Sequence, residues 1–94
     1  IMQPDTVLAG DVTLVAPVIA NVQTKTKGHN DGTIVLPATL KDSKGNDVKV
    51  TATIRDGYGK VETNGQLAPG VHTVTFSADG YKDVTAGASV TDKP

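Results

Sequence analysis

The chain has 94 residues, a formal net charge of −1 from nine basic and ten acidic side chains, and no cysteine. Its length suits a single domain, its balanced charge provides no basic surface for nucleic acid, and the absence of cysteine excludes disulfides and thiolate metal sites. No apolar run approaches the length of about 18 residues that a membrane-spanning helix needs. We therefore expect neither nucleic-acid binding nor membrane insertion.

The composition favours an all-β fold. Val and Thr are frequent, Leu is scarce, and the aromatic residues are Phe76, Tyr58 and Tyr81, a bias typical of pleated and half-buried surfaces. The ten Gly and five Pro lie mostly between the apolar runs, where they predict turns. Residues 1–9 and 92–94 lack a periodic apolar face. We expect linker stubs there, with one domain over residues 10–91.

The N-terminal half predicts three strands. The first covers residues 11–15, the second runs from Pro17 to about residue 24, and the third follows a loop of turn-forming residues at 28–32. Pro37 donates no ladder bond, so it predicts an edge or a bulge in the third strand. Alternation at period two gives the side chains expected to point inward, which are Val12, Leu14, Val18, Ala20, Val22, Ile34, Leu36, Ala38 and Leu40.

The C-terminal half predicts four more strands. A hairpin turn at 44–46 leads into a strand that ends near residue 55, and turns at 56–59 and 64–65 enclose a short strand at 60–63. A strand between Pro69-Gly70 and Asp79-Gly80 and a last one over 82–90 complete the chain. The inward side chains are Val48, Val50, Ala52, Ile54, Val74, Phe76, Ala78, Val84, Ala86, Ala88 and Val90. About seven short antiparallel strands without a helix predict an immunoglobulin-like β-sandwich.

Three stretches resemble a known family. They are ATLKDSKGNDV at 38–48, DGYGKVET at 56–63 and LAPGVHTVTFSADGY at 67–81. They resemble the prealbumin-like Cna-B and carboxypeptidase-regulatory-like patterns found among bacterial and phage immunoglobulin-like domains. The resemblance implies a sandwich and, in some members, a self-formed Lys–Asn crosslink. Lys25 or Lys27 matches the reactive Lys of that pattern, but the last strand holds no Asn to accept it.

Residues able to perform chemistry are few, so we expect no enzyme, no catalytic residue, no cofactor and no metal site. His29 and His72 lie far apart in the sequence and are interpreted as two solvated imidazoles. The segment 42–47 could supply calcium ligands, but a hairpin turn accounts for it. Lys25 and Lys27, just before His29, are interpreted as a solvated strand end, with a phosphate or glycan-phosphate contact as the alternative.

The two tyrosines are expected to differ. Tyr81 should pack across the end of the sandwich with its hydroxyl on the backbone, as a corner tyrosine does. Tyr58 lies in a turn where a large ring has little to pack on, so we expect an exposed platform for a sugar or a protein. Together with His29 and Asn30 in the 28–32 loop, Tyr58 forms the predicted ligand-binding site.

These features predict a non-enzymatic, surface-displayed module of a larger bacterial or phage protein, serving spacing, display or weak adhesion. Its expected partners are a cell-surface glycan or protein, bound weakly and multivalently, and neighbouring domains of a longer chain. Its expected location is extracellular, on a bacterial cell surface or a phage virion. The alternatives are an accessory domain of a phage capsid or tail protein that aids host attachment, and an accessory module of a carbohydrate-processing enzyme.

Overall fold

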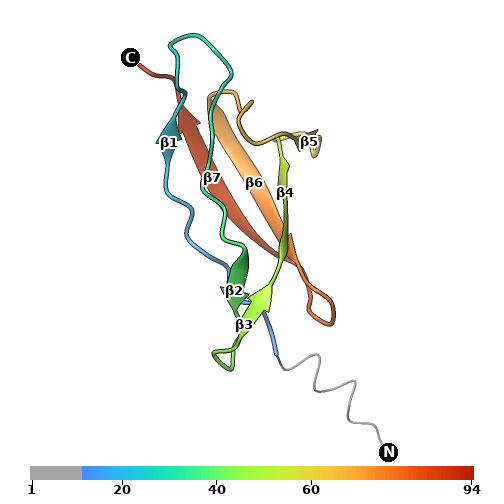
Figure 1. The fold of residues 1–94 in the computed structure, drawn as a ribbon. Coiled ribbons are helices and arrows are strands. Elements are labelled where there is room, and N and C mark those ends of the chain that lie inside the picture. Colours follow the sequence, from blue (N-terminus) through green and yellow to red (C-terminus); the bar gives the residue numbers. More distant parts are fainter. Residues whose placement is uncertain (1–11) are drawn as a thin grey trace, which may run out of the picture.

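The computed structural model describes residues 12–94, and that range contains strands and no helix. The strands are β1 (Val22–Gln23), β2 (Thr39–Lys41), β3 (Asp47–Lys49), β4 (Thr51–Arg55), β5 (Val61–Glu62), β6 (Gly70–Ser77) and β7 (Val84–Thr91) (Figure 1). The predicted all-β class is confirmed, and the immunoglobulin-like subclass stays a prediction. No helix in the described part of the chain could cross a membrane. The predicted stub at 1–9 lies outside the described residues.

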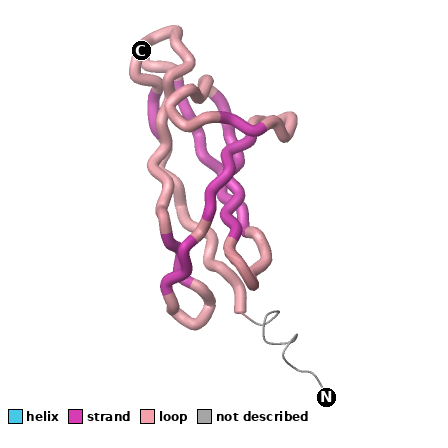
Figure 2. The backbone as a smooth tube through the Cα atoms, turned by 45° about the vertical axis from the view of Figure 1, so that its right-hand side comes forward, coloured by secondary structure: helices cyan, strands magenta, loops and turns pink. Residues whose placement is uncertain are grey.

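Five strands form one sheet in the order β1-β7-β6-β4-β5, and β2 and β3 pair as a separate antiparallel hairpin. Every pair in the five-stranded sheet is antiparallel except β1 with β7, which run parallel with Val22 opposite Val90. Figures 1 and 2 show an elongated domain with the β2–β3 hairpin at one end and Pro94 at the other. We call these the hairpin end and the carboxyl-terminal end.

A second layer covers one face of the sheet, and much of it lacks regular structure. It consists of the β2–β3 hairpin and the extended segments 12–21 and 31–38. The predicted strand at 11–15 is reduced to a single bridge between Leu14 and Asp42, and a second bridge joins Gly32 to Leu67. Pro17 and Pro37 interrupt the two segments, and a proline cannot donate a bond to a ladder, so neither segment forms a continuous strand.

The hydrophobic core lies between the two layers. The second layer and the connector before β6 contribute Leu14, Ile19, Ile34, Leu40 and Leu67. The five-stranded sheet contributes Ile54, Val74, Phe76, Ala88 and Val90. Phe76 is completely buried, and burial of a side chain of that size stabilises the folded state by about 1.5–3 kcal/mol. Because both layers supply large apolar side chains, the domain is a sandwich in its packing.

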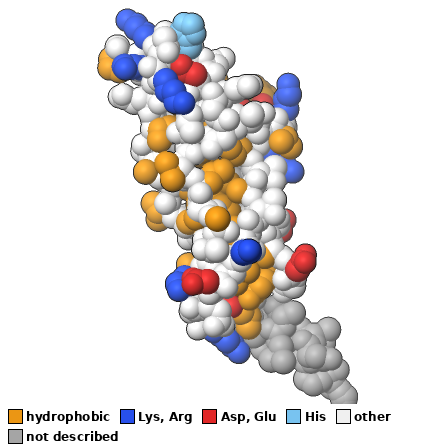
Figure 3. Space-filling view, viewed as in Figure 1, with side chains coloured by type: hydrophobic (Ala, Val, Ile, Leu, Met, Phe, Trp, Pro, Cys, Tyr) orange, Lys and Arg blue, Asp and Glu red, His pale blue; other side chains and the backbone are white. Residues whose placement is uncertain are grey.

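The predicted inward set was wrong in the segment before β1. Val18 is 99% exposed and Ile19 is 7% exposed, and Ala20 is also exposed, the reverse of the predicted order. No ladder holds this segment at period two, so the larger Ile19 packs into the core instead. Val15, Val18 and Val35 consequently face outward from the second layer. Figure 3 shows hydrophobic side chains along the middle of one face of the domain.

The alternation predicted in the C-terminal half is confirmed. Val74, Phe76, Ala88 and Val90 are buried, while the intervening Thr73 and Gly87 are exposed. The strand predicted to run to residue 55 is divided at Val50, whose amide donates to the Ala38 carbonyl at 3.1 Å. Val50 therefore marks the point at which the chain passes from the hairpin in β3 to the five-stranded sheet in β4.

The hairpin end is fixed by Asp42. Its Oδ1 accepts bonds from the Lys44 and Asn46 amides at 3.0 and 2.9 Å, and its Oδ2 accepts one from the Tyr81 hydroxyl at 2.9 Å. The bond from Asn46 is the largest cause that lowers the pKa of Asp42, and the bond to Asp42 raises the pKa of Tyr81. The predicted position of Tyr81 is confirmed, but its hydroxyl contacts a carboxylate and not the backbone.

Candidate functional site

The connectors at the carboxyl-terminal end carry the residues predicted to bind a ligand. This end holds the 24–31 loop after β1, the 56–60 turn between β4 and β5, and the 63–69 connector before β6 (Figure 1). Loops on a rigid sheet can carry exposed polar and aromatic groups without disturbing the core. The geometry of each connector therefore decides what this end can bind.

The 24–31 loop is closed by Asp31. Its Oδ1 accepts bonds from the Lys25 and Thr26 amides at 2.7 and 3.3 Å, and the His29 amide donates to the Thr26 carbonyl at 3.1 Å. Burial raises the pKa of Asp31, but hydrogen bonds from Thr26 and Lys25 outweigh it, so the pKa is lowered overall. Asp31 thus stays ionised and holds the loop in one shape, with His29 and Asn30 exposed at its tip.

The same loop is fastened to the segment after β7. The buried Thr24 hydroxyl donates to Asp92 Oδ1 at 3.3 Å and accepts a bond from the Lys93 amide at 2.9 Å. Asp92 Oδ1 also accepts a bond from the Gly28 amide at 3.0 Å. The start of the loop and the end of the chain therefore form one hydrogen-bonded unit.

Tyr58 lies on a turn that Asp56 organises. Asp56 Oδ1 accepts bonds from the Tyr58 and Lys60 amides, both at 2.9 Å, and the Lys60 bond is the largest cause that lowers the pKa of Asp56. Gly59 takes a positive φ of 85°, which favours glycine. The Tyr58 side chain is 99% exposed, as predicted. Its role in ligand binding stays a prediction.

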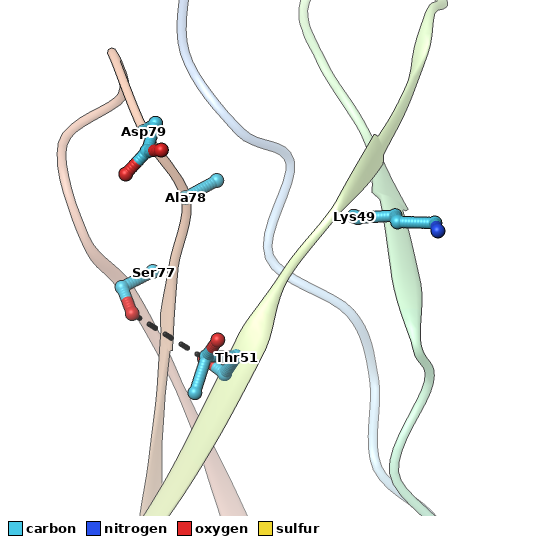
Figure 4. Close-up of a pocket in the computed structure, with 5 residues that line it drawn as sticks. All are labelled: Lys49, Thr51, Ser77, Ala78 and Asp79. Atoms are coloured by element: carbon cyan, nitrogen blue, oxygen red, sulfur yellow. Dashed lines mark hydrogen bonds between the residues drawn. The ribbon is translucent and has the colours of Figure 1, made fainter.

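Tyr58, His29 and Asn30 lie at the same end of the domain, but on two different connectors. They line neither of two depressions on the described surface. One, of about 280 Å³, is lined by Lys49, Thr51, Ser77, Ala78 and Asp79. Figure 4 shows the Lys49 amine pointing away from Ser77 and Asp79. The other, of about 270 Å³, is lined by Asp56, Lys60, Val61, Glu62, Thr63 and Gln66. In the first depression, the polar groups do not converge on one point.

The prediction that His72 is solvated was wrong. His72 is 4% exposed; its Nδ1 lies 2.5 Å from Glu62 Oε1 and its Nε2 lies 2.7 Å from the Ala68 carbonyl oxygen. Burial lowers the pKa of His72, but the bonds to Ala68 and Glu62 raise it by more, so the pKa is raised overall. Both ring nitrogens face acceptors, which requires a proton on each. Below its folded-state pKa, which is raised, His72 is therefore an imidazolium that ties β6 to β5 and to the 63–69 connector.

Sequence reasoning offered one signal for this pair. His72 is in phase with Val74 and Phe76 on β6, so period two places it on the inward face. A buried imidazole needs partners, but the sequence does not single out Glu62, since Asp79 is nearer to His72 along the chain. The pair joins two elements of the fold, and both ring nitrogens of His72 already contact protein oxygens.

The fold and these connectors define an all-β module whose polar groups mainly brace its own turns. The profile of the phage tail tube protein C-terminal domain family matches residues 13–94, and the chain belongs to that family. It is 78% identical over 92 residues to the tail tube proteins of Lactococcus phages F4-1, p2 and SK1. Each match covers 98% of this chain and 31% of the relative, so the chain spans about a third of their length. No solved structure matches it.

This assignment corrects the resemblance to the Cna-B and carboxypeptidase-regulatory-like families, which was wrong. The stretches behind that resemblance hold turn residues, such as Asp42, Asp56 and Gly59, whose bonds shape hairpins. Hairpins of unrelated β-domains need the same residues. The chain is a domain of a phage tail tube protein and thus a virion component. The assignment confirms that it is not an enzyme and favours the phage-tail alternative over the cell-surface adhesin.

Proposed function

We propose that this domain is a structural module that projects from the wall of a phage tail tube, with its carboxyl-terminal end outermost. The observation that carries the proposal is the separation of its two ends: the Thr13 carbonyl accepts a bond from the Ser43 amide at the hairpin end, and Pro94 lies at the other end (Figure 1). The relatives are about three times as long as this chain. The other two thirds of their sequence are long enough to form the tube wall. Its partners are the rest of the parent chain and neighbouring copies of the tube subunit.

Electron microscopy of tails tests this proposal. Tails whose tail tube protein lacks residues 12–94 should assemble into tubes of normal length with a narrower and smoother outline. Their matched control is the full chain with Val71→Ser, an exposed side chain on β6, which should retain the outer density. If the truncated protein forms no tubes, the domain belongs to the tube wall and the proposal fails.

A second candidate is weak attachment to a host surface through Tyr58, His29 and Asn30. The 99% exposure of the Tyr58 side chain on a turn braced by Asp56 favours it, since an aromatic platform of fixed shape loses little conformational freedom on binding. One copy should bind a glycan no more tightly than roughly millimolar, and many copies should bind through effective concentration.

The test of this candidate compares the monomer with beads that carry many copies, each with and without Tyr58→Ala. Tyr58→Ala should abolish retention of the beads on host cells, while Val71→Ala, which trims another exposed apolar side chain, should not. Equal retention of the two variants would exclude Tyr58 as a contact.

A further inference from the structure

Four cationic or imidazole side chains gather at the carboxyl-terminal end of the domain. Lys25, Lys27 and His29 lie on the 24–31 loop, and Lys93 lies on the segment hydrogen-bonded to it. We call them the basic tip. All four residues are exposed, and Figure 3 shows Lys or Arg and His side chains together at this end. Asp31 and Asp92 lie in the same region, so the lysines outnumber the carboxylates there by one, whereas the chain as a whole carries a net charge of −1.

The carboxylates of the same region form no ion pair with the basic tip. Asp31 Oδ1 is directed at the Lys25 and Thr26 amides, and Asp92 Oδ1 at the Gly28 amide and the Thr24 hydroxyl. Within residues 12–94, the ion pairs are Lys41 with Asp47 and His72 with Glu62, so no lysine of the basic tip is paired. Three lysines and the two carboxylates give this region a net charge of +1, and the lysine amines are exposed while the carboxylates are directed at the backbone.

We propose that the basic tip binds a linear anionic polysaccharide, whose charge is carried by phosphate or carboxylate groups. Lysine amines are flexible point charges that suit repeating anions of variable spacing. No aromatic side chain lies between residues 24 and 31 to stack a base, as proteins that bind single-stranded nucleic acid require. Useful affinity needs many copies on one particle, and in that respect the inference rests on the proposed projection from the tube.

The experiment measures retention of beads bearing many copies of the domain on immobilised phosphomannan, polygalacturonate and neutral mannan. The domain should bind both anionic polymers and not mannan, and added salt should weaken the binding. The phosphomannan and polygalacturonate arms identify which anion is preferred. The variant Lys25→Gln with Lys27→Gln and Lys93→Gln should lose at least about tenfold in binding, since each lysine near an anionic surface contributes about 1 kcal/mol.

The matched control removes the same charge from the hairpin end, by Lys41→Gln with Lys44→Gln and Lys49→Gln. Lys41 pairs with Asp47 at 2.8 Å, but both side chains are more than 60% exposed, so the fold should tolerate the change. The control should lose less than about twofold in binding, because charges beyond about 10 Å from the polymer are screened. Equal losses in the two variants would mean that net charge alone drives binding, and would overturn the proposal.

Two further results would overturn it: no binding to either anionic polymer, or binding to single-stranded DNA as strong as to the polysaccharides. The polymer assay does not depend on where the domain sits in the tail. Tails with normal outer density but no polymer binding would refute the basic tip and leave the proposed function intact. Polymer binding by a domain that microscopy places in the tube wall would refute the proposed function and leave the basic tip intact.

Discussion

Gly32 is a residue of the second layer that packs tightly against Val90 of β7 and Leu67 of the connector before β6. Its amide donates to the Leu67 carbonyl at 3.0 Å, and its own carbonyl accepts bonds from the Gly65 and Leu67 amides. A Cβ at this position would lie 2.8 Å from Val90 Cγ1 and 2.9 Å from the Leu67 carbonyl oxygen. Glycine is therefore required at this position because there is no room for a Cβ atom.

Gly32→Ala should lower the free energy of unfolding by about 1–3 kcal/mol, because the added methyl group forces the backbone of the 63–69 connector to move. Gly57→Ala is the control. A Cβ there meets nothing within 4 Å, so the change should stay within about 0.5 kcal/mol. Urea titrations followed by circular dichroism measure both values. Equal losses would show that the layers do not approach as closely as described.

At the scale of elements, β4 has its inward face defined by Ile54. Ile54 is 4% exposed and lies opposite Val74 of β6. Ile54→Asp buries a charge without a partner and should leave most molecules unfolded. Thr53→Asp, on the other face of the strand, should cost less than about 1 kcal/mol. Thermal melts of the two variants compare them directly, and similar melting temperatures would mean that the register of β4 is wrong.

The link between β5 and β6 through His72 makes stability depend on pH. The folded-state pKa of His72 lies above its ordinary value of 6.5. The stabilisation is therefore fully present below pH 6.5 and is lost as the pH rises through the folded-state pKa. Unfolding free energies measured from about pH 5.5 to about pH 9 should fall with rising pH. Glu62→Gln keeps an acceptor but removes the charge, so its slope should be smaller; an unchanged slope would exclude Glu62 as the cause.

Elements held by ladders could be predicted from the sequence, and the others could not. The inward sets of β4, β6 and β7 follow the expected alternation because paired strands fix side chains at period two. The expectation failed at Val18 and Ile19. Pro17 and the lack of a ladder mean that side chains there do not alternate at period two. The exposure of Tyr58 was predictable because its turn is local. The contact between His72 and Glu62 was not predictable. It depends on how β4 is aligned with both β5 and β6, and the sequence does not show that alignment.

At the scale of the whole molecule, the two layers differ in how their backbones are bonded. The central strands β4, β6 and β7 share ladders on both sides. In the second layer, β2 and β3 pair with each other, but outside that hairpin the bridges involve Leu14 and Gly32, and segments 16–21 and 35–37 lie outside the strands. Apolar packing holds this layer more than backbone bonding does.

Hydrogen exchange should reveal this difference. Amides of β6 and β7 should exchange by global unfolding and set the slowest rates, whereas amides at 16–21 and 35–37 should exchange through local opening. Exchange of the native domain followed by mass spectrometry, or by nuclear magnetic resonance at single amides, measures both classes. Uniform protection across the two layers would show that the second layer has bonds beyond those described.

The parallel pairing of β1 with β7 determines how the domain bears mechanical load. β1 continues the chain from the hairpin end, and β7 leads to Pro94 at the opposite end. A pull between the hairpin end of the chain, before β1, and the segment after β7 acts along the two strands in opposite directions. The pairs of Val22 with Val90 and Gln23 with Thr91 are then loaded together in shear. They resist together and do not open one after the other, so under such a pull the two strands should separate late and abruptly.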